Sequence, residues 1–250
     1  MTTIRLLTAC VLTLAAVPAY GQSAARAQPA RGFVTFNAAA QGAAADLTDR
    51  VFFESNAETG TIETRYPGRT GLLIDVGGGW RVWRRLGVGV AVSRTTSSGT
   101  AAVTAEMPHP FFDNRDRHIE GEATSVSRTQ TATHAELYYE LPSRGRWRMR
   151  LFAGPSYFNL EQDVVTAVSA DETYPYDTAG FGSATTGRAK GSGLGINGGA
   201  DVAWMFSRRI GAGALIRYAH ASLDLTAPGS RNVSSDGGGL QGGGGIRILF

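Results

Sequence analysis

Gly-Ile-Arg-Ile-Leu-Phe, residues 245–250, is the most informative stretch of this chain. Its apolar residues Ile246, Ile248 and Phe250 recur at every second position, so they share one face of a strand, whereas Arg247 points to the other face. A final strand with an apolar outer face, a polar inner face and an aromatic end is typical of a barrel with lipid outside and water inside. The stretch therefore predicts the closing strand of a transmembrane β-barrel.

The other end of the chain predicts export. Arg5 precedes an apolar run at 6–17, which has the length of a signal-peptide core and is too short to cross a bilayer as a helix. The run is followed by small residues, and cleavage after residues 25–27 (Ala-Arg-Ala) gives a signal peptide of residues 1–27. Residues 19–21 are an alternative cleavage site.

Composition is compatible with one exported domain, residues 28–250. The only cysteine, Cys10, lies in the signal peptide, so disulfides contribute nothing to the mature chain. The net charge is only +3 and the charges are interspersed, so no basic patch suggests nucleic acid. After the signal, no stretch is apolar and long enough for a membrane helix. Barrel strands give a weaker signal, about ten residues of alternation each.

Such alternation is present. Leu72, Ile74 and Val76 share one face, for example, while Leu73 and Asp75 share the other. With the two terminal segments, eight strands are predicted: 33–41, 72–82, 86–93, 134–141, 147–157, 194–206, 210–218 and 240–250. The fold class is therefore all-β, an eight-stranded antiparallel up-and-down transmembrane barrel.

The predicted connections alternate in length. Three are tight turns, at 83–86, 142–146 and 207–209. Four are long polar loops, at 43–70, 96–127, 163–187 and 226–236. Short turns on one rim and long loops on the other are the expected asymmetry of an outer-membrane barrel. The segment 51–65 in the first long loop has strand character of its own, which leaves ten strands as an alternative.

Aromatic residues on the outward face recur near strand ends, as membrane-interface girdles do. They are Trp80, Tyr139, Trp147, Trp204, Phe206, Tyr218 and Phe250. With the export signal, the strand pattern and the terminal stretch, the mature chain resembles the small bacterial outer-membrane barrels of the OmpA/OmpX/OmpW type. The resemblance implies an outer-membrane location with extracellular long loops, and an insertion signal at Ile246, Ile248 and Phe250.

The same resemblance implies the partners. They are outer-membrane lipid, including lipopolysaccharide, and the barrel-assembly machinery during insertion, with a monomer as the expected oligomeric state. Such barrels include anchors, adhesins, narrow channels and a few lipid-modifying enzymes. The resemblance therefore identifies an architecture and not an activity.

The predicted lumen is charged. Its inward positions carry Asp75, Arg81, Glu136, Glu140, Arg148, Arg150, Asp201, Arg217 and Arg247. Buried charges are costly unless paired, so we expect ion pairs, with Glu140 opposite Arg148 and Glu136 diagonal to Arg150. Such pairs would plug the narrow barrel; alternatively, they would line a narrow path for small solutes or ions.

Other motifs carry little chemistry. Gly193, Gly195 and Gly198 match a dinucleotide fingerprint, but they lie inside a strand rather than before a helix. No His or acidic cluster has metal-ligand spacing, and no cofactor is implied. His220-x-Ser222 resembles the pair of barrel-type lipid A deacylases. The downstream Glu of those enzymes is missing here, and Asp224 is too close to replace it.

Two loop segments are rich in aromatic residues and proline. They contain Phe111 and Phe112 in the second long loop and Tyr174 and Tyr176 in the third. Exposed apolar loop residues often mark contact surfaces, and a lid over the barrel mouth is the alternative. The sequence thus predicts a non-enzymatic barrel with a structural or surface-interaction role, with a narrow channel as the second hypothesis and a lipid-modifying hydrolase as the third.

Overall fold

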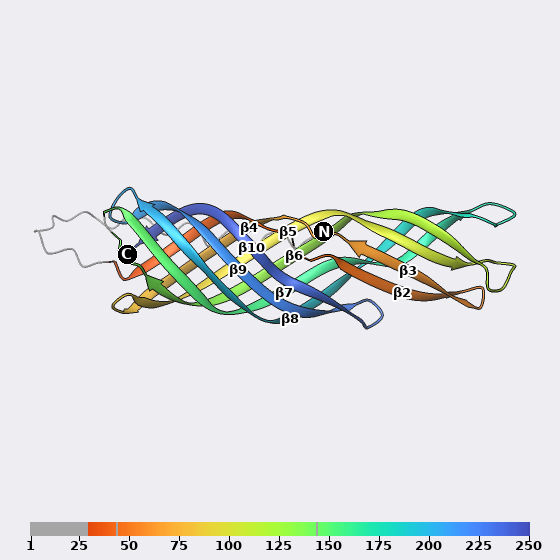
Figure 1. The fold of residues 1–250 in the computed structure, drawn as a ribbon, viewed down its shortest axis with the longest axis horizontal. Helices are drawn as coiled ribbons and strands as arrows, with labels where there is room; N and C mark the ends of the chain where they lie inside the picture. Colours follow the sequence, from red (N-terminus) through yellow and green to blue (C-terminus); the bar gives the residue numbers. More distant parts are fainter. Residues whose placement is uncertain (1–29, 44, 144) are drawn as a thin grey trace, which may run out of the picture.

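The computed structural model describes residues 30–43, 45–143 and 145–250. The predicted signal peptide, residues 1–27, lies outside this range. Ten antiparallel strands dominate the described residues (Figure 1). A helix long and apolar enough to cross a bilayer does not occur in this part of the chain.

The strands follow one another along the chain. They are β1 (Gly32–Gln41), β2 (Leu47–Ser55), β3 (Glu58–Tyr66), β4 (Gly71–Trp83), β5 (Leu86–Pro108), β6 (Asp116–Glu140), β7 (Trp147–Glu172), β8 (Ala179–Met205), β9 (Ile210–Ala227) and β10 (Arg231–Leu249).

Eight of these strands form a closed ring, in the order β1-β4-β5-β6-β7-β8-β9-β10. The ring closes where β1 pairs with β10, from Phe33 opposite Leu249 to Gln41 opposite Gln241. The backbone N–H groups of Arg31 and Gly32 both donate to the carbonyl of Phe250, at 2.9 and 2.8 Å. The predicted eight-stranded barrel is therefore confirmed.

The two remaining strands form a hairpin outside the ring. β2 and β3 pair with each other, and the segment 61–65 of β3 then pairs with 102–106 of β5. The strand character predicted for 51–65 is therefore confirmed. The two strands, however, do not join the ring around the lumen but form a hairpin beyond it. The described part of the chain thus contains ten strands, of which eight enclose the lumen.

The predicted long loops are mostly strand: besides the hairpin within 43–70, most of 96–127, 163–187 and 226–236 belongs to strands, and β9 and β10 are joined only by residues 228–230. β5 and β6 continue through 96–127 and are joined only by residues 109–115, and β7 and β8 are joined only by 173–178. The physical reason is a second apolar interior: inward residues such as Val103, Ile119 and Val164 are almost fully buried. These extensions make one end of the molecule long and narrow (Figure 1).

The outer surface is apolar in the half of the barrel that ends in the tight turns, which we call the tight-turn end. Leu72 and Leu194 are 69% and 77% exposed, and most outward positions at this level carry Val, Ile, Leu or an aromatic ring. Contiguous exposed apolar surface of this extent is unfavourable in water. The surface, which we call the apolar belt, therefore fits a hydrocarbon environment and gives the fold a membrane-spanning half.

Candidate functional site: the lumen and the outer core

The lumen inside the apolar belt contains a connected charge network. Arg217 of β9 donates to Asp75 of β4 at 2.7 Å and to Glu136 of β6 at 2.9 Å. Asp75 also accepts a hydrogen bond of 2.8 Å from Asn37 Nδ2 on β1. The Arg217 side chain is 2% exposed. Arg217 therefore reaches across the lumen to two carboxylates on β4 and β6, which are separated in the ring only by β5.

A second part of the network continues from Asn37. Arg247 of β10 donates to Asn37 Oδ1 at 2.6 Å and, through Nε, to Asp201 of β8 at 2.8 Å. Arg150 of β7 donates to the other oxygen of Asp201 at 2.7 Å. The Arg150 guanidinium also lies 3.5 Å from the ring centroid of Phe33, a cation–π contact. The network thus draws residues from seven of the eight ring strands.

The network is electrically balanced. Three carboxylates (Asp75, Glu136, Asp201) face three guanidinium groups (Arg150, Arg217, Arg247), and all six side chains are at most 11% exposed. Buried ions are tolerated when they are paired and hydrogen-bonded, as here. The remaining strand, β5, contributes small residues: a Cβ at Gly87 would lie 2.3 Å from the Tyr138 ring.

The expected ion-pair partners differ from those in the structure. Glu140 lies opposite Arg150, two residues from the expected register, and its ion pair is with Arg81 at 3.2 Å. Arg148 is exposed and donates to the backbone carbonyls of Gly145 and Trp147. The cause is a longer turn, because Leu141 N–H bonds to the Met149 carbonyl and displaces the register. The expected Glu140–Arg148 and Glu136–Arg150 pairs are therefore wrong, although Glu136 and Arg150 both join the network through other partners.

Above the charges lies a layer of neutral polar groups that the sequence analysis did not single out. His134 is fully buried and is hydrogen-bonded to Ser93 Oγ at 3.0 Å and to Ser156 Oγ at 2.8 Å. Asn197 donates to the same Ser156 oxygen at 2.9 Å. Three glutamines complete this layer: Gln41, Gln130 and Gln241. The period-two alternation of the sequence places His134 on the inward face. Its contacts with Ser93 and Ser156, however, depend on how the strands pair in the closed ring.

The outer half of the interior is apolar. A buried cluster extends from the hairpin to β9, and includes Ile62, Phe158, Leu160 and Leu225, each at most 2% exposed. Tyr66 ties the hairpin to this cluster, because its hydroxyl accepts a 2.6 Å hydrogen bond from the Val165 backbone N–H. The outer end of the lumen is therefore filled by hydrophobic side chains.

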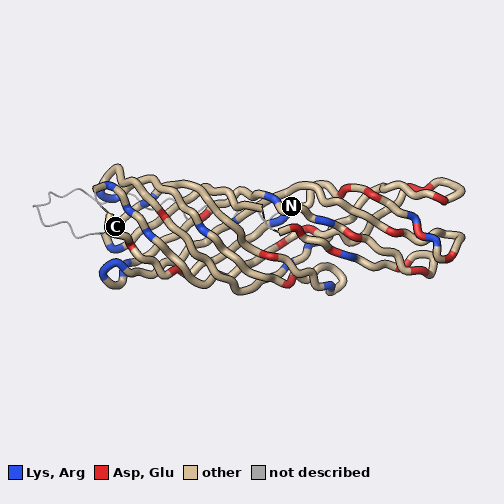
Figure 2. The backbone as a smooth tube through the Cα atoms, viewed as in Figure 1, with Lys and Arg blue, Asp and Glu red and all other residues tan. Residues whose placement is uncertain are grey.

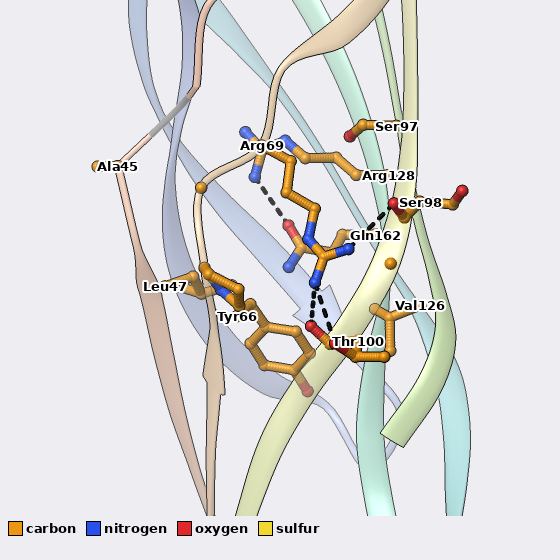
Figure 3. Close-up of a pocket in the computed structure, with 13 residues that line it drawn as sticks. Ala45, Leu47, Tyr66, Arg69, Ser97, Ser98, Thr100, Val126, Arg128 and Gln162 are labelled. Carbon is orange, nitrogen blue, oxygen red and sulfur yellow. Dashed lines mark hydrogen bonds between the residues drawn. The ribbon is translucent and has the colours of Figure 1, made fainter. Parts of the chain in front are cut away.

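Two small cavities lie among the described residues. One of about 30 Å³ lies in the lumen beside Asp75, Glu136 and Arg217. That volume holds a water molecule or two rather than a solute path. A second, of about 40 Å³, lies in the wall between β5 and residues 67–70, which connect the β2–β3 hairpin to β4 (Figure 3). There Arg69 donates to the Ser98 carbonyl at 3.1 Å and packs directly over Gly99.

The predicted aromatic loop residues meet at the tips of the two long hairpins. The ring centroids of Phe111 and Tyr176 are 5.6 Å apart, and those of Tyr174 and Tyr176 are 6.1 Å apart. The ring centroids of Phe112 and His109 are 4.8 Å apart, with the two rings tilted against each other. Phe111 and Tyr174 remain 68% and 80% exposed. The structure therefore joins both segments into one exposed aromatic surface, which we call the aromatic tip (Phe111, Phe112, Tyr174, Tyr176).

The residues considered for hydrolysis lie in a row on the outward face of β9. Ser222 Oγ donates to Asp236 at 3.3 Å, and Asp224 accepts from Ser234 Oγ at 2.7 Å. Among the described residues, no hydrogen bond joins His220 to either of them. A nucleophile needs a base within hydrogen-bond reach, and this arrangement does not supply one.

Comparison with solved structures identifies the architecture. The outer membrane protein OprG from Pseudomonas aeruginosa matches with a TM-score of 0.51 and 10% identity, over 89% of this chain and 97% of that chain. The outer membrane protease OmpT from Escherichia coli matches with a TM-score of 0.49 and 8% identity, over 89% and 97%. Neisserial surface protein A matches with a TM-score of 0.42 and 14% identity, over 88% and 97%.

The comparisons at the sequence level give no family. No family model matches the chain, and no curated protein matches it. The match to OprG, at 10% identity, establishes the fold alone. The chain therefore has the fold of the small outer-membrane β-barrels.

Proposed function

We propose that this protein is an integral outer-membrane β-barrel with a closed lumen and a role in structure or surface interaction. The observation that carries the proposal is the filling of the interior along its whole length. The charge network occupies the level of the apolar belt, and the hydrophobic cluster occupies the outer half. A solute would have to displace both layers to pass.

The surface outside the belt supports an interaction role. The long hairpins project away from the belt (Figure 1), and three of the four rings of the aromatic tip, Phe111, Phe112 and Tyr174, are exposed there. Exposed aromatic clusters of this kind are typical contact surfaces. The proposed environment of the belt is lipid, with lipopolysaccharide at the hairpin end, and the barrel is a monomer that the barrel-assembly machinery inserts.

Measurement of ion conductance distinguishes the proposed closed barrel from the alternative of a narrow channel. Folded protein, verified by its heat-dependent shift on gels, is reconstituted into planar bilayers, with a conducting porin as positive control. We expect no discrete conductance steps, because a cavity of about 30 Å³ is too small for a continuous water path. Regular, reproducible openings from the folded sample would contradict the closed lumen and favour the narrow channel.

Cell fractionation tests the location separately. The protein should be found in the outer-membrane fraction and should fold only in detergent or lipid, because its exposed apolar belt would otherwise contact water. Recovery as a stable monomer in detergent-free buffer would contradict the membrane location itself.

A further inference from the structure

The tight-turn end of the barrel carries a ring of exposed arginines. Its members are Arg31, which precedes β1, five arginines of the three tight turns (Arg84, Arg85, Arg146, Arg208 and Arg209), and Arg148, the second residue of β7. Among the described residues, none of the seven forms an ion pair with a carboxylate. The turn residues 83–85, 145–146 and 206–209 include no Asp or Glu at all. Positive charge is therefore concentrated in the turns at this end of the molecule, where Figure 2 shows Lys and Arg positions in blue.

The arginine ring borders a ring of tryptophans. All four tryptophans of the chain (Trp80, Trp83, Trp147, Trp204) lie at this end, and each is at least 38% exposed. Trp147 and Trp204 pack edge to face at 4.9 Å, and Arg84 lies 5.0 Å from the Trp83 ring centroid. Exposed tryptophans favour the headgroup level of a bilayer. The neighbouring turn arginines are therefore within reach of lipid phosphates.

The opposite end has a different charge pattern. Its exposed charges are of both signs (Figure 2), and many are paired, for example Arg115 with Asp177 at 3.1 Å and Arg50 with Glu63. The contrast shows that the basic ring is not a general consequence of the small positive net charge. It is confined to the rim where the apolar belt ends.

We propose that the arginine ring binds the headgroups of anionic phospholipids in the leaflet at the tight-turn end. The inference rests on the proposed membrane location. A docked protein would need one patch, whereas a lipid leaflet contacts the barrel all the way round, as the ring does. Guanidinium groups bind phosphate oxygens through paired hydrogen bonds. Each basic residue near an anionic surface strengthens binding about fivefold, and salt screens this attraction.

The tryptophans supply a direct assay. Protein is reconstituted into phosphatidylcholine bilayers that contain the same mole fraction of either brominated phosphatidylglycerol or brominated phosphatidylcholine. Bromine quenches tryptophan fluorescence on contact, so the ratio of the two quenching values measures which lipid surrounds the rim. We expect phosphatidylglycerol to quench about threefold more strongly at low salt, and the ratio to approach one in high salt.

Two matched variants test the assignment. The quadruple variant Arg84→Gln, Arg85→Gln, Arg208→Gln, Arg209→Gln removes four rim charges and should bring the quenching ratio close to one. The control removes four exposed charges elsewhere: Arg50→Gln, Arg115→Gln, Arg188→Gln, Lys190→Gln. It should keep the wild-type ratio. Both variants are first checked for folding by their heat-dependent shift on gels.

The quenching experiment tests the lipid preference separately from the proposed membrane location. Strong quenching by brominated phosphatidylcholine shows that the rim lies in a bilayer, whatever the headgroup preference. Equal quenching by the two lipids in the folded wild-type protein would overturn the anionic-lipid site and leave the membrane location standing. Loss of preference in the control variant as well would assign the effect to net charge and would also overturn the proposal.

Discussion

Arg217 and Asp75, 142 positions apart in the chain, meet across the lumen at 2.7 Å, and their side chains are only 2% and 1% exposed. The pair connects β9 to β4, which are not neighbours in the ring. Its formation requires the closed barrel, since no local segment brings these strands together. The stability that this ion pair contributes therefore depends both on closure of the barrel and on the exclusion of water from the lumen.

Removing this arginine should destabilise the barrel. Arg217→Met leaves Asp75 and Glu136 without their main counter-ion in a confined interior, and an unpaired buried charge costs about 3–5 kcal/mol. Adding Asp75→Asn and Glu136→Gln should recover much of the loss. Denaturant unfolding in lipid vesicles measures each step, and Arg50→Gln, from an exposed pair with Glu63, should change stability by about 1 kcal/mol or less. If Arg217→Met alone left the free energy of unfolding unchanged, the result would indicate a water-filled lumen.

The Tyr66 hydroxyl should hold the hairpin against β7. Burial raises the pKa of Tyr66 to about 12, so the group is neutral at ordinary pH. Tyr66→Phe leaves the buried Val165 N–H without this acceptor, at a cost of about 1–3 kcal/mol. Hydrogen exchange at Val165 and along β2 and β3 should accelerate, while exchange in the ring strands inside the belt should not. Tyr157→Phe, on the lipid-facing side, serves as the control; equal acceleration in both variants would refute the specific tie.

The outer hairpin of β5 and β6 should weaken as pH rises. His118 hydrogen-bonds Glu106 at 2.6 Å and Glu120 at 3.1 Å, and these carboxylates raise the pKa of the imidazole above its ordinary 6.5. Because the folded pKa is the higher one, the stabilisation is complete below pH 6.5 and is lost as pH passes the raised value. An NMR titration of the His118 ring measures the midpoint. Glu106→Gln should lower that midpoint, and an unchanged midpoint would show that the contact is absent in solution.

Phe250 should matter more for assembly in cells than for intrinsic stability. Its ring lies 6.0 Å from Trp80, and its carbonyl accepts the two N–H bonds that begin β1. If Phe250 belongs to the insertion signal, its deletion reduces the folded protein in the outer membrane, while refolding into detergent in vitro suffers much less. Comparable losses in the two assays would assign Phe250 a stabilising role instead.

The sequence by itself predicted the ring. Period-two alternation is a local property of the backbone, so the eight strands, the tight turns and the outward aromatics were all recognisable without tertiary information. The same rule placed Asp75, Glu136, Asp201 and Arg217 on the inward face. It also detected strand character at 51–65, which the structure resolves into a hairpin outside the ring.

Only the tertiary structure decided which inward residues meet. A shift of two positions in the turn between β6 and β7 preserves every inward and outward assignment but changes every partner, so Glu140 pairs with Arg81 and not with Arg148. The hydrophobic outer core was likewise unpredictable, because the small residues of β5 and β8 acquire apolar neighbours only when the extended hairpins pack together. Alternation fixes the face of each side chain locally, whereas contacts across a lumen depend on register and closure of the whole ring.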